Sequence, residues 1–367
     1  MTALPYLLLF AAPVLLVAGQ RLGGGWNLAT VIGLFLLVPL TDLALGIDET
    51  STEAAGVANA RLSFRAITWL AVPVQVGIVC WSAAEAARCG FHGATLAAFL
   101  LSTGVTTGTV GITIAHELVH RRSRFERVLG EILLATVCYM HWGLEHLAGH
   151  HRFVATPLDP ASARFGESLY VFLPRSIGGS YRSAWSIECR RLRRLGLAPW
   201  HVRNRMVWFT LCPSLLAALL GSVFGLAAAL FFLAQSAIAI VLLEVVNYVE
   251  HYGLSRRPLG DGRFERVSEL HSWNASHRFS NRGLFNLQRH SDHHLEAGRP
   301  YELLRHHPRS PQLPMGYGAM VLVALVPPLW RWVMDARVLE QRGIARPAAV
   351  SAQASLALRS WGATAGL

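Results

Sequence analysis

The feature that most constrains the fold of this chain is a series of long apolar segments. Six of them lie near 4–19, 28–47, 66–87, 94–120, 206–224 and 226–250. Each is close to the roughly 20 residues that a helix needs to cross a bilayer. The sequence as a whole is 53% hydrophobic and only 15% charged, which is too apolar for an ordinary soluble domain. We therefore predict an all-α integral membrane protein with six transmembrane helices.

Two further apolar stretches are not expected to cross the membrane. The first, 128–144, is short and precedes a long arginine-rich segment, so it should pack beneath the bundle or dip into the interface. The second, 316–334, contains two prolines and an arginine, which favours an interfacial or re-entrant segment. We predict a single membrane-bound domain over 1–337 and a C-terminal tail, 338–367, that forms no separate domain.

The orientation in the membrane is predicted from the positions of the arginines. All 33 basic residues are arginine, and 24 of them lie within 121–205 and 256–309. Because arginine-rich loops remain on the cytoplasmic side, both segments should face the cytoplasm, together with both termini. The net charge of +11 could also indicate nucleic acid, but beside so many apolar segments it indicates membrane lipids instead.

Histidines are concentrated in four short motifs near the expected ends of these helices. The nine residues concerned are His116, His120, His146, His150, His151, His251, His290, His293 and His294. In a helix, residues three or four apart share a face. This spacing predicts that His116 faces the same way as His120, His146 the same way as His150, and His290 the same way as both His293 and His294.

Nine imidazole nitrogens exceed what one zinc ion uses, since a structural zinc takes four protein ligands and a catalytic zinc three. The His-Glu-x-x-His pattern at 116–120 also occurs in zinc proteases, but such a site would leave the other motifs unexplained. Two metal ions with four or five nitrogens each account for all nine. Iron fits best, because imidazole suits it and open positions on iron permit oxygen chemistry. The alternative is that some of these histidines lie on the surface near the membrane interface.

Other polar residues near the motifs are candidates for orienting the ligand rings through hydrogen bonds. They are Glu117, Glu145, Asp159, Glu250, His271, Asn274 and Asp292. His271 and the nearby His277 could equally be structural. The remaining histidines lack partners at helical spacing, and we interpret them as packing or surface residues: His92, His141, His201, His306 and His307.

The order of these motifs resembles that of the integral-membrane alkane monooxygenase family. The resemblance covers about 41–335 and includes the segment His271-Ser272-Trp273-Asn274 and the segment Pro327-Pro328-Leu329-Trp330. It implies a six-helix fold in the bacterial inner membrane and a cytoplasmic-side non-haem di-iron site in which all nine histidines are ligands. It also implies O2-dependent hydroxylation of a terminal alkane carbon to give a 1-alcohol. An alkane dissolves in the bilayer, so an entrance between helices would suit it.

The resemblance further implies that rubredoxin, reduced by an NADH-dependent reductase, supplies the electrons. The five cysteines contain no C-x-x-C pair, which argues against an iron–sulfur module within this chain. The donor should therefore be a separate acidic protein that docks on the positive cytoplasmic face. The docking candidates are Arg190, Arg191, Arg193 and Arg194.

Two other functions use similar features. A membrane fatty-acyl desaturase or a xylene-type aromatic-methyl hydroxylase is built on comparable histidine motifs, and a desaturase would yield an alkene. A transporter would need charges along a path through the membrane. The sequence offers few mid-helix candidates for such a path: Asp42, Glu85, Glu131 and Glu244.

Overall fold

The computed structural model describes residues 2–53, 61–90 and 92–344. These residues are mostly helical, as predicted. Within the described ranges the only sheet is a small antiparallel hairpin of β1 (Pro258–Gly260) and β2 (Arg263–Phe264).

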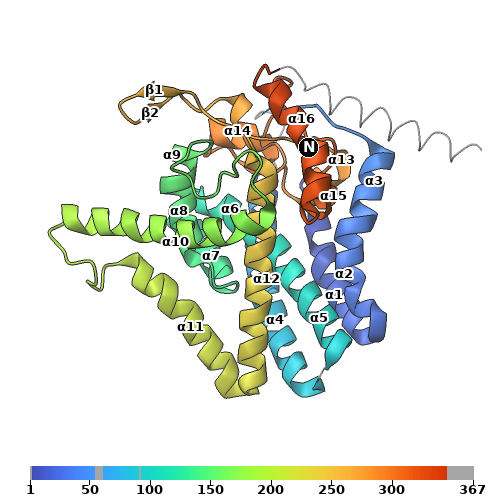
Figure 1. The fold of residues 1–367 in the computed structure, drawn as a ribbon. Coiled ribbons are helices and arrows are strands. Elements are labelled where there is room, and N and C mark those ends of the chain that lie inside the picture. The colour runs from blue at the N-terminus through green and yellow to red at the C-terminus, as the bar shows by residue number, and fades with distance from the viewer. Residues whose placement is uncertain (1, 54–60, 91, 345–367) are drawn as a thin grey trace, which may run out of the picture.

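Six helical spans are long and apolar enough to cross a membrane, and they form the body of the molecule (Figure 1). The first consists of η1 (Leu4–Phe10) and α1 (Ala11–Leu22), and the second of η2 (Gly24–Leu28), α2 (Ala29–Ile32), η3 (Gly33–Leu37) and α3 (Val38–Leu45). The others are α4 (Arg61–Cys89), then α5 (Gly93–Thr107) with η5 (Gly108–Ile112) and α6 (Thr113–Val119), then α11 (Arg205–Phe224) and α12 (Leu226–His251). The protein is therefore an all-α integral membrane protein with six candidate spans, which confirms the predicted fold class.

The remaining helices are shorter or polar. They are α7 (Arg124–Ala135), α8 (Met140–Glu145), η6 (His146–His150), α9 (His151–Phe153), α10 (Leu169–Arg194), η7 (Glu269–His271), α13 (Arg278–Gly283), α14 (His290–Leu295), η8 (Tyr301–Leu303), α15 (Tyr317–Ala324) and α16 (Pro327–Gln341). At 12 residues, α7 is too short to cross a bilayer. The proline-containing stretch forms α15 and α16, which meet at 120°. Helix α16 continues into the predicted tail, and residues 345–367 of that tail lie outside the described part of the chain.

The six spans form three helical hairpins, and the turn within each hairpin lies at the same end of the bundle. Gly23 and Gly225 lie in two of these turns with φ of 74° and 93°, a conformation that favours glycine. At the other end, the hydroxyl of Tyr6 in the first span accepts a hydrogen bond of 2.8 Å from Asn286. All four histidine motifs lie at this second end, where α6 and α12 finish and α14 packs (Figure 1).

The fourth span, through α5 and η5, packs closely against α12. A Cβ atom on Gly104 would lie 2.5 Å from Cβ of Ile238, and one on Gly108 would lie 3.2 Å from Cα of Ala239. Only small residues allow helices to approach this closely. Both spans end at the histidine end of the bundle, the fourth span with His116 on α6 and the sixth with His251 at the end of α12.

Buried carboxylates fix the segments that precede and cover the histidines. Glu244 on α12 accepts hydrogen bonds from Tyr139 just before α8 and from Ser176 on α10. Glu188 on α10 binds the guanidinium groups of Arg191 and Arg205, which ties α10 to the start of α11. These contacts hold α8 and α10 against the bundle.

Candidate metal centre

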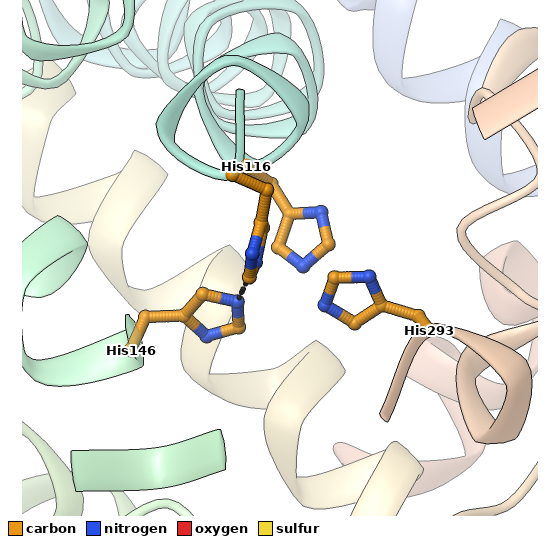
Figure 2. A group of neighbouring side chains, drawn as sticks. His116, His146 and His293 are labelled. Carbon is orange, nitrogen blue, oxygen red and sulfur yellow. Dashed lines mark hydrogen bonds between the residues drawn. The ribbon is translucent and has the colours of Figure 1, made fainter. Parts of the chain in front are cut away.

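All nine predicted ligand histidines are gathered at one end of the bundle. They come from the end of the fourth span, the segment from η6 to α9, the end of α12, and α14. Figure 2 shows the rings of His116, His146 and His293 pointing toward one another from three different elements.

The nine rings form two groups, each of which could hold one metal ion. In each group, ring nitrogens lie within 4.8 Å of one another: His116, His120, His146 and His293 in the first, and His150, His251, His290 and His294 in the second. His151 joins the first group, because its Nε2 lies 3.2 Å from that of His120, 3.1 Å from that of His146 and 3.0 Å from that of His293. We call these sets the five-histidine group and the four-histidine group.

The division between groups differs from the expected pairing of His146 with His150. Residues His146–His150 form a π-helical turn, in which the backbone bonds run from i to i+5. His146 therefore faces the same group as His151, and His150 points into the other group. The i,i+4 rule failed here because the local helix is wider than an α-helix.

Helix α14 is also shared between the groups, although all three of its histidines were expected to converge. His290 and His294, four residues apart, lie together with Nε2 atoms 3.0 Å apart in the four-histidine group. His293 belongs to the five-histidine group. Both η6 and α14 thus supply ligands to both groups, which holds the groups next to each other. The ring centroids of His151 and His294 are 4.6 Å apart.

The spacing of the nitrogens fits bound metal ions. Ligand nitrogens at about 2.1 Å from an ion and at right angles to one another are separated by about 3.0 Å. The observed separations include 3.0 Å between Nε2 of His146 and His120 and 3.3 Å between Nε2 of His290 and His251. In addition, the buried Nε2 atoms of His116 and His150 have no hydrogen-bond partner within the described part of the chain. Unpaired buried nitrogens of this kind are expected where a metal ion binds.

The electrostatic environment keeps most of these rings neutral, which is the form that binds metals. Burial lowers the pKa of His146, His290 and His293 well below the ordinary value. Burial also lowers the pKa of His120, to about 3, with a smaller effect from the charge of His150.

His150 is oriented by Asp159. Burial alone would lower the pKa of His150, but the Asp159 carboxylate, 2.9 Å from Nδ1, raises it. Asp159 also accepts hydrogen bonds from the hydroxyl of Ser162 at 2.6 Å and the backbone N–H of Ala161 at 3.0 Å. The proton of His150 is thus held on Nδ1, which leaves Nε2 free for a metal ion.

Glu145 lies beside the π-helical turn. Its Oε1 accepts a hydrogen bond of 3.0 Å from Ser183 on α10, and a Cβ atom on Gly149 would lie 2.1 Å from this oxygen. Burial, with a contribution from the negative charge of Asp159, raises the pKa of Glu145 to about 8. Glu145 therefore joins α10 to the turn that carries His146 and His150, and glycine at 149 leaves room for it.

Two other candidate carboxylates bind partners outside the ligand rings. Glu117 forms an ion pair with Arg121 at 2.5 Å. Asp292 lies 2.7 Å from His307 and 2.9 Å from Arg299. His307, which we predicted to be a packing or surface residue, thus has a specific partner. The positions of Glu117 and Asp292 in the sequence, next to predicted ligands, did not reveal these contacts.

The segment that contains His271 and Asn274 packs against α14, which carries three of the histidines. Asn274 donates to Oγ of Ser291 at 2.7 Å and accepts from its backbone N–H at 2.8 Å, which fixes the start of α14 beside His290. His271 accepts a hydrogen bond from the backbone N–H of Ser268 at 2.9 Å and so caps η7. His277 forms a backbone bridge with Ile47.

The sequence interpretation missed Trp142. Its ring stacks on His146, with centroids 4.4 Å apart and planes 19° from parallel. The i,i+4 spacing of the two residues could have indicated this contact. Trp142 restricts the orientation of His146 and also lines the cavity described next.

An apolar chamber of about 280 Å³ lies between the membrane-spanning helices, and histidines of both groups line it. Its polar lining residues include His116, His146, His290, Asn247, Glu250 and Tyr317. Its apolar lining residues include Leu8, Leu15, Leu34, Leu37 and Val38. Leu37 is also 55% exposed, so the chamber lies next to the outer surface of the second span.

The chain is similar to several known proteins. Residues 90–324 match the family model described as fatty acid desaturase. Alkane 1-monooxygenase 2 of Pseudomonas aeruginosa is 42% identical over 326 residues, which cover 87% of this chain and 86% of that protein. Alkane 1-monooxygenase 1 of the same species is 44% identical over 319 residues, covering 85% and 83%. The xylene/toluene monooxygenase hydroxylase component of Pseudomonas putida is 28% identical over 235 residues, covering 64% and 62%. The chain belongs to the alkane 1-monooxygenase family, within the wider fatty acid desaturase family.

Proposed function

We propose that this protein hydroxylates alkanes to 1-alcohols with O2 at a non-haem di-iron centre, using electrons from rubredoxin. The observation that carries the proposal is that one apolar chamber meets both histidine groups. His116 and His146 of the five-histidine group and His290 of the four-histidine group all line it. The relatives named alkane 1-monooxygenase support the substrate class.

We assign one iron ion to each histidine group. Neutral imidazole is a suitable iron ligand, and nine of them exceed the needs of a single zinc ion. A bound iron centre supplies the oxidising power for attack on a terminal C–H bond, which protein side chains lack. Besides holding the iron ions, the protein is proposed to exclude water from this site, and the buried ring of Trp142 contributes to that exclusion.

The chamber selects substrate by shape rather than by hydrophobicity. An alkane in the bilayer is already in an apolar solvent, so its transfer into the chamber gains little from the hydrophobic effect. Its affinity must come from close packing against side chains such as Leu15 and Leu34. A slender chain suits a volume of about 280 Å³, which lies just below the roughly 300–1,000 Å³ typical of sites for drug-sized ligands.

For electron delivery we propose that rubredoxin docks on the arginine-rich end of α10. Arg190, Arg193 and Arg194 are exposed, whereas Arg191 is paired with Glu188. Arg190 lies about 10 Å along the helix from Ser183, which contacts Glu145 next to the metal site. Charge reversal at Arg190, Arg193 or Arg194 should slow turnover when rubredoxin is limiting, and so should high salt. Arg88, at the opposite end of the bundle, provides the control, because its reversal should leave this rate unchanged.

We propose the bacterial inner membrane as the location, with the histidine end and both termini in the cytoplasm. The support is the arginine distribution, since the two arginine-rich segments contain or border the four histidine motifs, which lie at one end of the bundle. Reporter fusions at the N-terminus and in the turn between α11 and α12 distinguish the two orientations. Activity of a periplasmic reporter at the N-terminus would oppose the proposed one.

The function is tested by product analysis with isotopically labelled oxygen. Membranes that contain the protein are supplied with rubredoxin, its reductase, NADH, ¹⁸O2 and a mixture of alkanes. The expected products are 1-alcohols that contain one ¹⁸O atom, detected by mass spectrometry. A protein in which His293 is replaced by alanine serves as the inactive control. Unlabelled alcohol, or no alcohol from an iron-loaded protein, would contradict the proposal.

The same experiment separates the alternative functions. The match to the fatty acid desaturase family model supports a desaturase, which would give an alkene from an acyl substrate. The similarity to the xylene/toluene hydroxylase component supports attack on an aromatic methyl group, which would give a benzyl alcohol. Transport is less well supported, because Glu250 is the only carboxylate among the described residues that line the chamber.

A further inference from the structure

The carboxylate of Glu250 enters the four-histidine group from the chamber side. Its Oε2 lies 3.3 Å from Nε2 of His290, the same separation as that between Nε2 of His290 and Nε2 of His251. The Glu250 side chain is 3% exposed, and both Glu250 and His290 line the chamber. One carboxylate oxygen is therefore placed among the nitrogens that would hold an ion.

A simple hydrogen bond does not account for this arrangement. Nε2 of His290 also lies 3.0 Å from Nε2 of His294, and a neutral ring carries a single N–H group. If Nε2 of His290 binds a metal ion, that nitrogen and Oε2 of Glu250 present lone pairs to each other. Two such atoms in a buried site repel unless a cation lies between them.

The charge of the site also requires an anion. Nine neutral imidazoles carry no charge, whereas two divalent ions would bring four positive charges into a buried region, where uncompensated charge is costly. Asp159 contacts the group only through Nδ1 of His150. Among the described residues, Glu250 alone places a carboxylate oxygen within 4.0 Å of Nε2 of one of the nine histidines.

We infer that Glu250 is a ligand of the ion held by the four-histidine group, on the side that faces the chamber. This inference rests on the proposed two-ion centre. The two ions then differ: one has five neutral nitrogens, and the other has four nitrogens and a carboxylate. The ion with the anionic ligand is the one that His290 presents to the chamber.

The test uses ⁵⁷Fe(II) as the probe and Mössbauer spectroscopy as the readout. Full-length, metal-free protein is loaded anaerobically, and the wild type is compared with Glu250→Gln and Glu244→Gln. Glu244 is the matched control, because it is a fully buried glutamate on the same helix that accepts hydrogen bonds from Tyr139, Ser176 and Asn247 and contacts none of the nine histidine rings. We expect two wild-type doublets of equal area, and we expect Glu250→Gln to change one of them. The Fe(II) dissociation constant of that one ion should rise at least about 10-fold. Glu244→Gln should leave both doublets unchanged.

Two unchanged doublets and unchanged affinities in Glu250→Gln would overturn the assignment, even if the wild type binds two irons. If Glu250→Gln does not fold, Glu250→Asp decides, since the shorter side chain withdraws the carboxylate from the same ion. A change in one doublet of Glu250→Asp supports the assignment, and an unchanged spectrum rejects it. A wild-type protein that binds fewer than two irons would instead refute the di-iron proposal, and this inference with it.

Discussion

Replacing Asp159 by asparagine should weaken binding of one metal ion while leaving the other in place. The Asp159 carboxylate is buried and accepts the Nδ1–H of His150 at 2.9 Å. An amide has one acceptor oxygen and one donor nitrogen. If the nitrogen faces His150, the proton of the ring moves to Nε2, where it competes with the metal ion. If the oxygen faces His150, the nitrogen points at the backbone N–H of Ala161, and two donors oppose each other.

The size of the effect follows from this geometry. Residues that orient a metal-bound histidine typically contribute 10- to 100-fold to metal affinity, or about 1.4–2.7 kcal/mol. We expect the upper half of this range for Asp159→Asn, because the bond is charge-assisted and buried. Ser162→Ala is the matched control. It removes one hydrogen bond to the same carboxylate but keeps the charge, so its effect should be less than about 10-fold.

The assay is competition between the protein and a chelator for Fe(II), with both binding steps resolved. Asp159→Asn should shift one step and leave the other within about twofold of the wild-type value. If both steps remain unchanged, Asp159 does not orient a metal ligand. If both weaken equally, the two groups are not separate binding sites, and the division into five and four histidines is wrong.

Three further substitutions test other parts of the structure. Glu188→Gln should lower the free energy of unfolding in detergent at pH 7 by on the order of 2 kcal/mol, measured by thermal unfolding. Burial raises the pKa of Glu188, but hydrogen bonds from its two arginine partners outweigh burial and lower this pKa from 4.5 to about 2. The contribution of Glu188 to the free energy of unfolding is therefore full above pH 4.5 and is lost as the pH falls toward 2. The difference from wild type should therefore shrink below pH 4.5, and a constant difference would contradict this. Asn274→Ala should lower the free energy of unfolding by about 1–3 kcal/mol, because it removes two hydrogen bonds to Ser291. The measurement is the unfolding midpoint, and an unchanged midpoint would contradict the prediction. Ala12→Phe should narrow the chamber and reduce turnover of longer alkanes more than shorter ones, and equal loss for all lengths would oppose the proposed chamber.

Much of the fold could be predicted from the apolar segments because a bilayer imposes a length on each helix. The six spans, the non-crossing segment at 128–144 and the bend near Pro327 were all accessible in this way. The local breaks within spans were not. The 3-10 and π segments, such as Gly33–Leu37 and Gly108–Ile112, depend on packing between helices that no periodicity in one helix reveals.

That the nine histidines come together was easier to predict than their division into two groups. Nine histidines in four motifs could be found by counting, but their division depended on the π-helical turn at His146–His150. The partners of polar groups were also hidden, since they lie far away in sequence. Asp292 binds His307, and Glu117 binds Arg121 rather than a ligand ring. Adjacency to a ligand in the sequence places a side chain nearby, but the fold decides what it faces.

The central claim, that the nine histidines form a centre for two iron ions, is tested most directly by metal analysis. The protein is purified without chelators under anaerobic conditions, and iron and zinc are measured per chain by mass spectrometry. We expect two iron ions per chain in the wild type. His116→Ala and His294→Ala, one from each group, should each reduce this number, whereas His92→Ala, in an exposed position outside both groups, should retain both ions. One zinc ion per chain and no iron would contradict the account.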